Sequence, residues 1–396
     1  MKKSLLTGLF CILSLFAINA QNADIQAIIN EVKSEFAPDK RVCVYDINLV
    51  QTENDPVLKG EISDNNIHNI LISKIKQVSP EIKDSVRVLP DSSLGNEYWG
   101  FVHLSLIIVR VAPNYRAEIC TQTLMGTPVK ILEKKNGWLH IQTPDGYIGW
   151  TSTDDIRRMN ELDRKAYNSL PKLVVTAYND FVYEKPDDKS MLVSDVIMGN
   201  ILVQGNKTKS ASKKFYAVTL PDGRKGYIST KSVIPYAAWQ KSIVLTGESI
   251  VSRAEKFIGL PYVWGGTSSR GLDCSGLSKT TYFMHGIILP RDASQQYRIG
   301  KEIDTTNGFE NLKAGDLLFF GRKNESDPSK PSIIHVAIYI GNQKYIHASG
   351  QVRINSFDPD SEDFDAYNRN RYIGAKRILG TQMKSCQRIF EHPWYN

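Results

Sequence analysis

One cysteine stands in a context that could support chemistry. Cys274 lies in the stretch GLDCSGLSKT, where a glycine-rich loop gives way to a segment with helical periodicity. A thiol attacks as its thiolate, and both the N-terminus of a helix and a neighbouring histidine favour that form. Its position therefore makes Cys274 a candidate nucleophile. A buried structural thiol, half of a disulfide and a metal ligand are the alternatives.

Two histidines lie where a base and its orienting partner would be needed. His335 opens the apolar run HVAIYIG, and His347 lies in KYIHASG beyond a tight turn at residues 341–343. With a three-residue loop, Ile340 pairs with Lys344, and His347 then lies diagonally from His335 on the same face of a sheet. This arrangement predicts a Cys-His-His triad, in which one imidazole accepts the thiol proton and the other orients the first.

Zinc is a second use for the same three side chains. However, the sequence contains no HExxH motif and no closely spaced ligand pair to support a zinc site. We therefore predict no metal and no cofactor. The other cysteines of the mature chain, Cys43, Cys120 and Cys386, are far apart, and most are predicted to be small core residues.

The elements around these residues predict an α+β domain over residues 244–380. An amphipathic helix over residues 248–258 ends at Gly259 and Pro261, and a second helix runs from Cys274 to the stop at His285 and Gly286. Short strands follow in LKAGDLLFFG, HVAIYIG and KYIHASG. A helix followed by an antiparallel sheet is an α+β layout.

An internal repeat organises the chain before this domain. TPDGYIGWTSTDDI (143–156) aligns with LPDGRKGYISTKSV (220–233) at an offset of 77 residues. Each copy contains short strands around a Pro-Asp-Gly turn, in which proline presets the backbone and glycine accepts a positive φ. We predict two small all-β barrels, over residues 91–165 and 166–243, so the whole chain is a multidomain protein.

The ends of the chain complete the predicted organisation. Residues 1–20 have a basic start, an apolar run and small residues before Gln21, which is typical of a secretory signal peptide. We expect an exported protein, periplasmic or secreted, with a lipid anchor at Cys11 as the less favoured alternative. Residues 21–90 are predicted to form a partly helical N-terminal arm, and residues 381–396 a C-terminal tail. We predict no integral membrane span and a monomer.

The composition excludes some classes of function. Hydrophobic residues at 41% and charged residues at 23% are ordinary values for a globular protein. The formal net charge of +7 suits an anionic polymer such as the bacterial cell wall. No basic run interleaved with aromatic residues indicates nucleic-acid binding, so we predict none.

Ordered sequence blocks link the C-terminal domain to a known family. PYVWGG, LDCSGL, RDASQQ, GDLLFF, HVAIYIG, IHAS and RYIGAKRIL occur in this order and resemble the NlpC/P60 family of cell-wall cysteine peptidases, which has a reduced papain-like fold. The resemblance implies Cys274 as nucleophile, His335 as general base and His347 as the orienting residue. The glycine and aromatic pattern that closes each barrel, GYIGW in the first, resembles bacterial SH3 domains.

Two SH3-like domains before an NlpC/P60 domain resemble, more specifically, the γ-D-glutamyl-L-diamino acid endopeptidases. This resemblance implies cleavage, through a thioester, of the bond between γ-D-Glu and meso-diaminopimelate or Lys in cell-wall peptides that begin with free L-Ala. Glu118 and Tyr147 match the acid and the tyrosine that hold the substrate ammonium in that group, whereas the second barrel has Arg224 in the tyrosine slot. The other substrate contacts implied by the resemblance are Tyr262, Trp264, Asp273, Ser275, Asp292 and Ser294.

Two other functions remain open at this stage. The same fold could act as an amidase or acyltransferase on another exported substrate. Alternatively, the chain could be a peptidoglycan-binding protein that is anchored by its SH3-like domains and whose thiol is idle.

Overall fold

The structure is a computed structural model, which describes residues 21–52, 56–205, 214–327, 329–381 and 387–396. The predicted signal peptide (residues 1–20) and Cys386 lie outside the described residues. The chain divides into two compact units. The first contains the residues up to Gly95 together with Ile131–Lys134, and the second contains Asn96–Lys130 and Lys135–Asn396.

The predicted N-terminal arm (residues 21–90) lies within the first unit, and its described residues have a hydrophobic core of their own. A helix covers residues 21–36. It is followed by β1 (Tyr45–Gln51), β2 (Pro56–Ile62), α2 (Asn65–Val78), β3 (Lys83–Val88) and the short η1 (Ser92–Leu94). β2 pairs antiparallel with β1 and parallel with β3. Asp64 caps α2 by accepting hydrogen bonds from the backbone amides of Asn66 and Ile67, and Ile25, Leu58 and Leu71 are fully buried.

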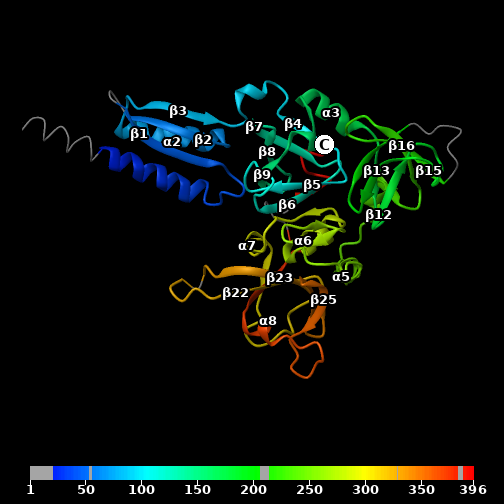
Figure 1. Cartoon of the computed structure of the whole chain (residues 1–396). Coiled ribbons are helices and arrows are strands. Elements are labelled where there is room, and N and C mark those ends of the chain that lie inside the picture. Colours follow the sequence, from blue (N-terminus) through cyan, green and yellow to red (C-terminus); the bar gives the residue numbers. More distant parts are fainter. Residues whose placement is uncertain (1–20, 53–55, 206–213, 328, 382–386) are drawn as a thin grey trace, which may run out of the picture. The chain divides into compact units, whose positions relative to one another are not determined.

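Two β-barrels with the same strand order come next in the chain (Figure 1), and apart from Ile131–Lys134 of the first barrel their described residues belong to the second unit. The first comprises β4 (Trp99–Val102), β5 (Leu106–Arg110), β6 (Ile119–Leu124), β7 (Pro128–Lys135), β8 (Trp138–Gln142), β9 (Ile148–Ser152), η2 (Thr153–Asp155) and β10 (Ile156–Met159). The second follows helix α3 (Glu161–Ser169) and comprises β11 (Lys172–Val175), β12 (Asn179–Tyr183), β13 (Leu192–Ile197), β14 (Ile201–Gln204), β15 (Phe215–Thr219), β16 (Lys225–Ser229) and β17 (Val233–Pro235).

The identical topology confirms that the sequence repeat is a repeated fold. The strand order is β10-β4-β7-β8-β9-β5-β6 in the first barrel and, in corresponding strands, β17-β11-β14-β15-β16-β12-β13 in the second. Both Pro-Asp-Gly turns have glycine at positive φ, 84° at Gly146 and 94° at Gly223. The turn chemistry predicted for each copy is therefore confirmed.

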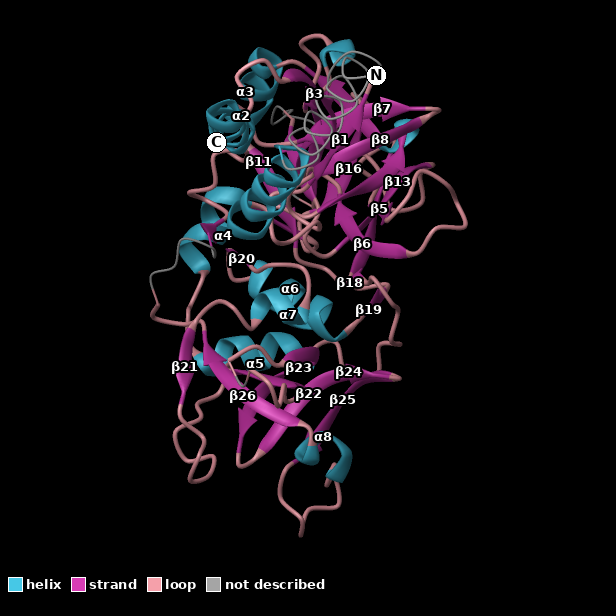
Figure 2. Ribbon diagram, turned by 90° about the vertical axis from the view of Figure 1, so that its left-hand side faces the viewer, coloured by secondary structure: helices cyan, strands magenta, loops and turns pink. Residues whose placement is uncertain are grey.

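The third domain has the predicted α+β architecture. Its elements are α4 (Tyr236–Ser242), α5 (Gly247–Glu255), β18 (Thr267–Ser268), β19 (Gly271–Leu272), α6 (Cys274–Phe283), β20 (Ile287–Ile288), α7 (Ala293–Gln296), β21 (Lys301–Ile303), β22 (Leu317–Arg322), β23 (Ser332–Gly341), β24 (Lys344–Ser349), β25 (Gln351–Ser356), α8 (Ala366–Asn370), β26 (Tyr372–Arg377) and β27 (Gln387–Arg388). The main sheet has the order β21-β26-β22-β23-β24-β25. Helices α5, α6 and α7 pack on β23 from one face of this sheet (Figure 2), which brings the start of α6 against the strand that carries His335.

The hairpin of β23 and β24 differs from the prediction at its turn. The turn has two residues, Asn342 and Gln343, both with positive φ, and Gly341 pairs with Lys344. The expected pairing of Ile340 with Lys344 is therefore wrong. A two-residue turn of this kind matches the twist of the strands, and an irregularity between Tyr339 and Gly341 absorbs the extra residue. Beyond that irregularity Ile338 pairs with Ile346, which restores the predicted register toward the two histidines.

Candidate active site

The candidate nucleophile is the first residue of α6. Asp273 caps this helix by accepting a hydrogen bond from the Gly276 amide at 2.7 Å, so the predicted helix start is confirmed. Burial raises the pKa of the Cys274 thiol to about 12, and the negative charge of Asp273 adds to this rise, whereas the backbone amides of Val336 and Ser275 oppose it. The expectation that the helix start makes this thiol acidic is therefore wrong, and its proton needs a base.

The two candidate histidines lie side by side on adjacent strands. His335 on β23 and His347 on β24 are buried, and Nε2 of His335 lies 2.8 Å from Nδ1 of His347. Nε2 of His347 lies 2.9 Å from Oδ1 of Asn355 on β25. Burial lowers the pKa of His335 well below its ordinary value and that of His347 to about 4. Both rings are therefore neutral near pH 7, the state that a general base requires.

Cys274 approaches this pair through the packing of α6 on β23. Its sulfur receives the backbone amide of Val336, the residue directly after His335, and both Cys274 and Val336 belong to the hydrophobic core of the domain. Since Nε2 of His335 faces His347, Nδ1 is the ring nitrogen left to accept the thiol proton. The arrangement can support nucleophilic acyl transfer.

A fully buried arginine that the sequence analysis did not single out lies behind the nucleophile. Arg291 donates to Oγ1 of Thr121 at 2.9 Å, to Oγ of Ser275 at 2.9 Å and to Oδ2 of Asp273 at 2.5 Å. Burial opposes the charge of this guanidinium, but the Asp273 carboxylate outweighs that effect and raises the pKa of Arg291. Asp273 and Ser275, both predicted as substrate contacts, are thus members of this buried network. In the sequence, Arg291 could have been noticed because it directly precedes Asp292, a predicted substrate contact, in RDASQQ.

The first barrel reaches the third domain through both residues predicted to hold an ammonium. Oε1 of Glu118 accepts a hydrogen bond from the indole N–H of Trp264 at 2.8 Å, and Trp264 is 61% exposed. The hydroxyl of Tyr147 donates to Oδ2 of Asp292 at 3.0 Å. Burial and then the charge of Asp292 raise the pKa of Tyr147, so its phenol stays neutral. One exposed and one buried contact therefore join this barrel to the loops on either side of α6.

The remaining predicted contacts lie on the same loops. Tyr262 is half-buried and its backbone amide donates to the Gly350 carbonyl at 2.9 Å. Burial raises the pKa of the Tyr262 phenol, so this hydroxyl stays neutral. Ser294 lies in the single turn of α7 and is partly exposed.

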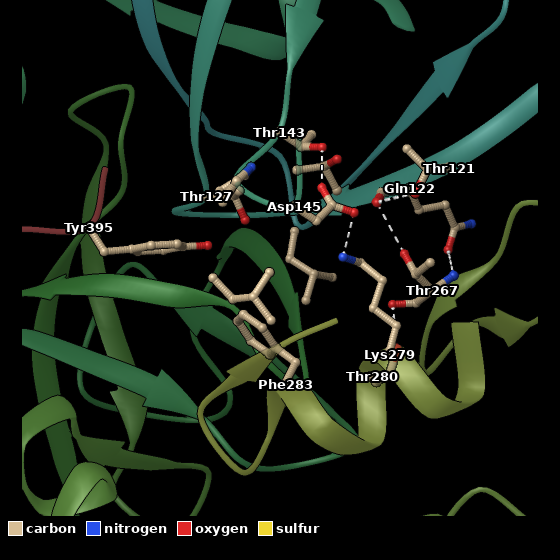
Figure 3. A pocket seen from close by; sticks show the side chains of 14 residues that line it. Thr121, Gln122, Thr127, Thr143, Asp145, Thr267, Lys279, Thr280, Phe283 and Tyr395 are labelled. Atoms are coloured by element: carbon tan, nitrogen blue, oxygen red, sulfur yellow. Dashed lines mark hydrogen bonds and ion pairs between the residues drawn. The ribbon is translucent and has the colours of Figure 1, made fainter. Parts of the chain in front are cut away.

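A small cavity marks the joint between the first barrel and α6 (Figure 3). On one wall Nζ of Lys279 lies 2.7 Å from Oδ2 of Asp145 and also donates to the Leu289 carbonyl. Oε1 of Gln122 accepts a hydrogen bond from the backbone amide of Thr267 at 2.9 Å. The cavity volume is about 60 Å³, enough for a few water molecules but not for a peptide. It is therefore a small gap at the contact between the first barrel and α6, and not a substrate cleft.

None of the helices in the described part of the chain is long and apolar enough to cross a lipid bilayer. Within the same residues, no group of three or more His, Cys, Asp and Glu side chains is placed to hold a metal ion.

Comparison with known proteins gives family matches to the third domain and to the first barrel. Residues 259–376 match the NlpC/P60 family, and residues 109–156 match the bacterial dipeptidyl-peptidase SH3 domain. The chain is 32% identical over 267 residues to a gamma-D-glutamyl-L-lysine dipeptidyl-peptidase of Bacillus cereus, a match that covers 65% of this chain and 75% of that protein. It is 30% identical over 253 residues to dipeptidyl-peptidase 6 of Lysinibacillus sphaericus, covering 62% of this chain and 87% of that one.

A solved structure resembles the chain over a similar extent. The crystal structure of an NlpC/P60 family protein from Bacillus cereus superposes with a TM-score of 0.59 at 26% sequence identity. The match covers 71% of this chain and 99% of that one. The SH3-like and NlpC/P60 folds predicted from the sequence blocks are confirmed.

Proposed function

The chain belongs to the NlpC/P60 family of cysteine peptidases, and we propose that it cleaves the bond between γ-D-Glu and a diamino acid in cell-wall peptides that begin with free L-Ala. The observation that carries this proposal is the pair of contacts from the first barrel, Glu118 to Trp264 and Tyr147 to Asp292. They close one end of the site with groups suited to an ammonium, beside a thiol backed by two imidazoles. The relatives named above act, by their names, as dipeptidyl-peptidases, and one on γ-D-glutamyl-L-lysine.

In the proposed reaction Cys274 is the nucleophile and His335 the base. Nδ1 of His335 takes the thiol proton as sulfur attacks the γ-carbonyl carbon of D-Glu. The carbon–nitrogen bond then breaks, and His335 returns the proton to the leaving amine of the diamino acid. This step leaves a thioester on Cys274, which a water molecule deprotonated by His335 hydrolyses to L-Ala-γ-D-Glu and the free thiol.

The oxyanion that forms during attack needs donors that are already in place. The backbone N–H of Cys274 is suited to this role, because it lies at the N-terminus of α6, where amides point away from the helix. Burial raises the pKa of the thiol, so the attack requires that His335 take its proton.

Recognition of the free amine follows from charge. An ammonium removed from water requires an anionic or hydrogen-bonding partner. Glu118 offers a carboxylate beside the exposed indole of Trp264, and Tyr147 offers a hydroxyl already oriented by Asp292. Acetylation of the L-Ala amine, or its attachment to muramic acid, removes the charge that these groups match. We therefore propose that the substrates are released peptides, met outside the cytoplasm.

The direct test is to incubate L-Ala-γ-D-Glu-meso-diaminopimelate and its lysine counterpart with the protein and to measure L-Ala-γ-D-Glu by mass spectrometry. Product is expected from the wild-type protein and from Cys43→Ala, which removes a free thiol in the other unit, but not from Cys274→Ala. N-acetylated peptides should not be cleaved. Undiminished cleavage by Cys274→Ala would overturn the mechanism, and equal rates on free and acetylated peptides would overturn the amine assignment. Binding to insoluble peptidoglycan without any hydrolysis would instead favour an anchoring protein.

A further inference from the structure

Asn355 occupies a defined place at the end of the histidine pair. It lies on β25 opposite Tyr345 of β24. Its Oδ1 is 2.9 Å from Nε2 of His347, and its Nδ2 donates to the backbone carbonyl of Asp363 at 3.1 Å. A backbone carbonyl can only accept a hydrogen bond, so the amide must turn its NH₂ group to Asp363 and its oxygen to His347. The orientation of this side chain is thereby fixed.

That orientation determines the position of each proton along the pair. The amide oxygen of Asn355 only accepts, so Nε2 of His347 carries a hydrogen. Burial keeps His347 neutral by lowering its pKa to about 4, so Nδ1 of His347 is a bare acceptor and receives the N–H of His335 Nε2. His335 is neutral for the same reason, which leaves its Nδ1 unprotonated.

We propose that Asn355 is a positioning residue that sets the tautomers of both histidines and so makes Nδ1 of His335 the basic nitrogen facing Cys274. This inference rests on the triad proposed above. It adds a fourth side chain to that triad, which acts through His347 and does not touch the reacting atoms. Without the amide oxygen, His347 is free to carry its proton on Nδ1. His335 must then carry its own proton on the nitrogen that faces the thiol.

The charged groups around His347 do not offer a competing partner. Arg353 and Arg371 disfavour its protonation, and Asp365 favours it. The Asp365 carboxylate, however, accepts the Tyr345 hydroxyl at 3.1 Å and the side-chain amide of Asn368 at 2.5 Å. The hydrogen bond that orients His347 therefore comes from Asn355.

The test compares Asn355→Leu, which removes the acceptor at similar size, with Asn355→Asp, which keeps an acceptor for Nε2–H of His347. Asn311→Leu is the matched control, because Nδ2 of Asn311 also donates to a backbone carbonyl, that of Asp304 at 3.0 Å, beside β21 at the opposite edge of the sheet. For Asn355→Leu we expect kcat to fall by about 10- to 100-fold with KM within about twofold. The loss is smaller than for a base held entirely in the wrong tautomer, because both tautomers are populated once the acceptor is gone. Asn355→Asp should recover most of kcat at alkaline pH. Its acid limb should move to higher pH, because a carboxylate stabilises protonated His347.

A second readout does not depend on the substrate. In ¹⁵N-histidine NMR spectra of Cys274→Ala, His335 and His347 should each show a protonated Nε2 and an unprotonated Nδ1, and this pattern should be lost when Asn355→Leu is added. Unchanged tautomers in the leucine variant, or equal losses of kcat in the leucine and aspartate variants at every pH, would overturn the proposal. Failure of the wild-type protein to cleave the peptide would instead count against the proposed function, since the NMR pattern is measured without it.

Discussion

The buried ion pair between Lys279 and Asp145 joins α6 to the Pro-Asp-Gly turn of the first barrel (Figure 3), and Lys279→Met isolates its contribution. The side chains are 19% and 4% exposed. Methionine keeps much of the apolar stem and removes the charge, which leaves Asp145 buried without its ion-pair partner but with its bonds to Thr143 and the backbone. Removing one partner of a buried pair typically costs about 3–5 kcal/mol of stability.

Protonation of Asp145 sets an upper limit on this loss and makes it depend on pH. An aspartate with an ordinary pKa of about 3.9 can be neutralised at a cost of about 4 kcal/mol at pH 7 and about 1.5 kcal/mol at pH 5. Burial would raise the pKa of Asp145, but Lys279 outweighs this effect and lowers it. The stability from the wild-type pair is therefore present above pH ~4 and lost as pH falls through the lowered pKa. In the variant, the destabilisation is expected to be greatest at neutral pH and to shrink toward pH 5.

Urea unfolding followed by tryptophan fluorescence at pH 7 and pH 5 measures this difference. Lys279→Met should lose about 3–4 kcal/mol at pH 7 and no more than about 1.5 kcal/mol at pH 5. Adding Asp145→Asn should restore most of the loss at pH 7. Lys344→Met, which breaks the exposed pair with Asp363, is the control and should change stability by less than about 1 kcal/mol. Equal losses at both pH values, or no recovery in the double variant, would refute this reasoning.

Two further predictions concern catalysis and binding. The acid limb of kcat/KM should lie below pH ~6.5, the ordinary pKa of histidine. Burial lowers the pKa of His335 and His347, so activity is lost only as pH falls through those lowered values. A limb at pH 7 or above would contradict the assignment of the base. Trp264→Phe removes the donor to Glu118 and should raise KM for the free-amine peptide about 2- to 10-fold with little change in kcat, as expected for one hydrogen bond. An unchanged KM in steady-state assays would show that this contact does not prepare Glu118 for the substrate.

Local patterns sufficed for the elements that carry the candidate triad. Asp273 is a typical capping residue, so the start of α6 at Cys274 could be predicted from its neighbours alone. The alternation of HVAIYIG and KYIHASG likewise predicts two paired strands with both histidines on one face. The predicted turn is one residue too long because it includes Gly341 as a loop residue, whereas Gly341 pairs with Lys344 and the turn consists of Asn342 and Gln343. Glutamine rarely adopts a positive φ, so the residue type at position 343 gives little indication of this turn.

The groups that support the triad were missed because their partners are distant in sequence. Arg291 bonds Thr121 across 170 residues, and a buried charge can be assigned only when the groups that neutralise it are known. Asn355 is eight residues from His347, but an asparagine in a short strand can form many different hydrogen bonds, so its residue type does not indicate this one. Its role becomes visible only through the carbonyl of Asp363, which orients its amide.

The repeat shows why similar folds need not have similar roles. The two barrels share one strand order and one turn, yet the slot of Tyr147 in the first holds Arg224 in the second. Tyr147 is buried and reaches Asp292 of the third domain. Arg224 instead binds Asp222 of its own turn at 2.6 Å and is 42% exposed. A neutral phenol can be buried against the third domain, whereas the guanidinium of Arg224 is bound by Asp222 and by the Val193 carbonyl of its own barrel. We therefore expect this difference to give the first barrel, and not the second, its part in the proposed site.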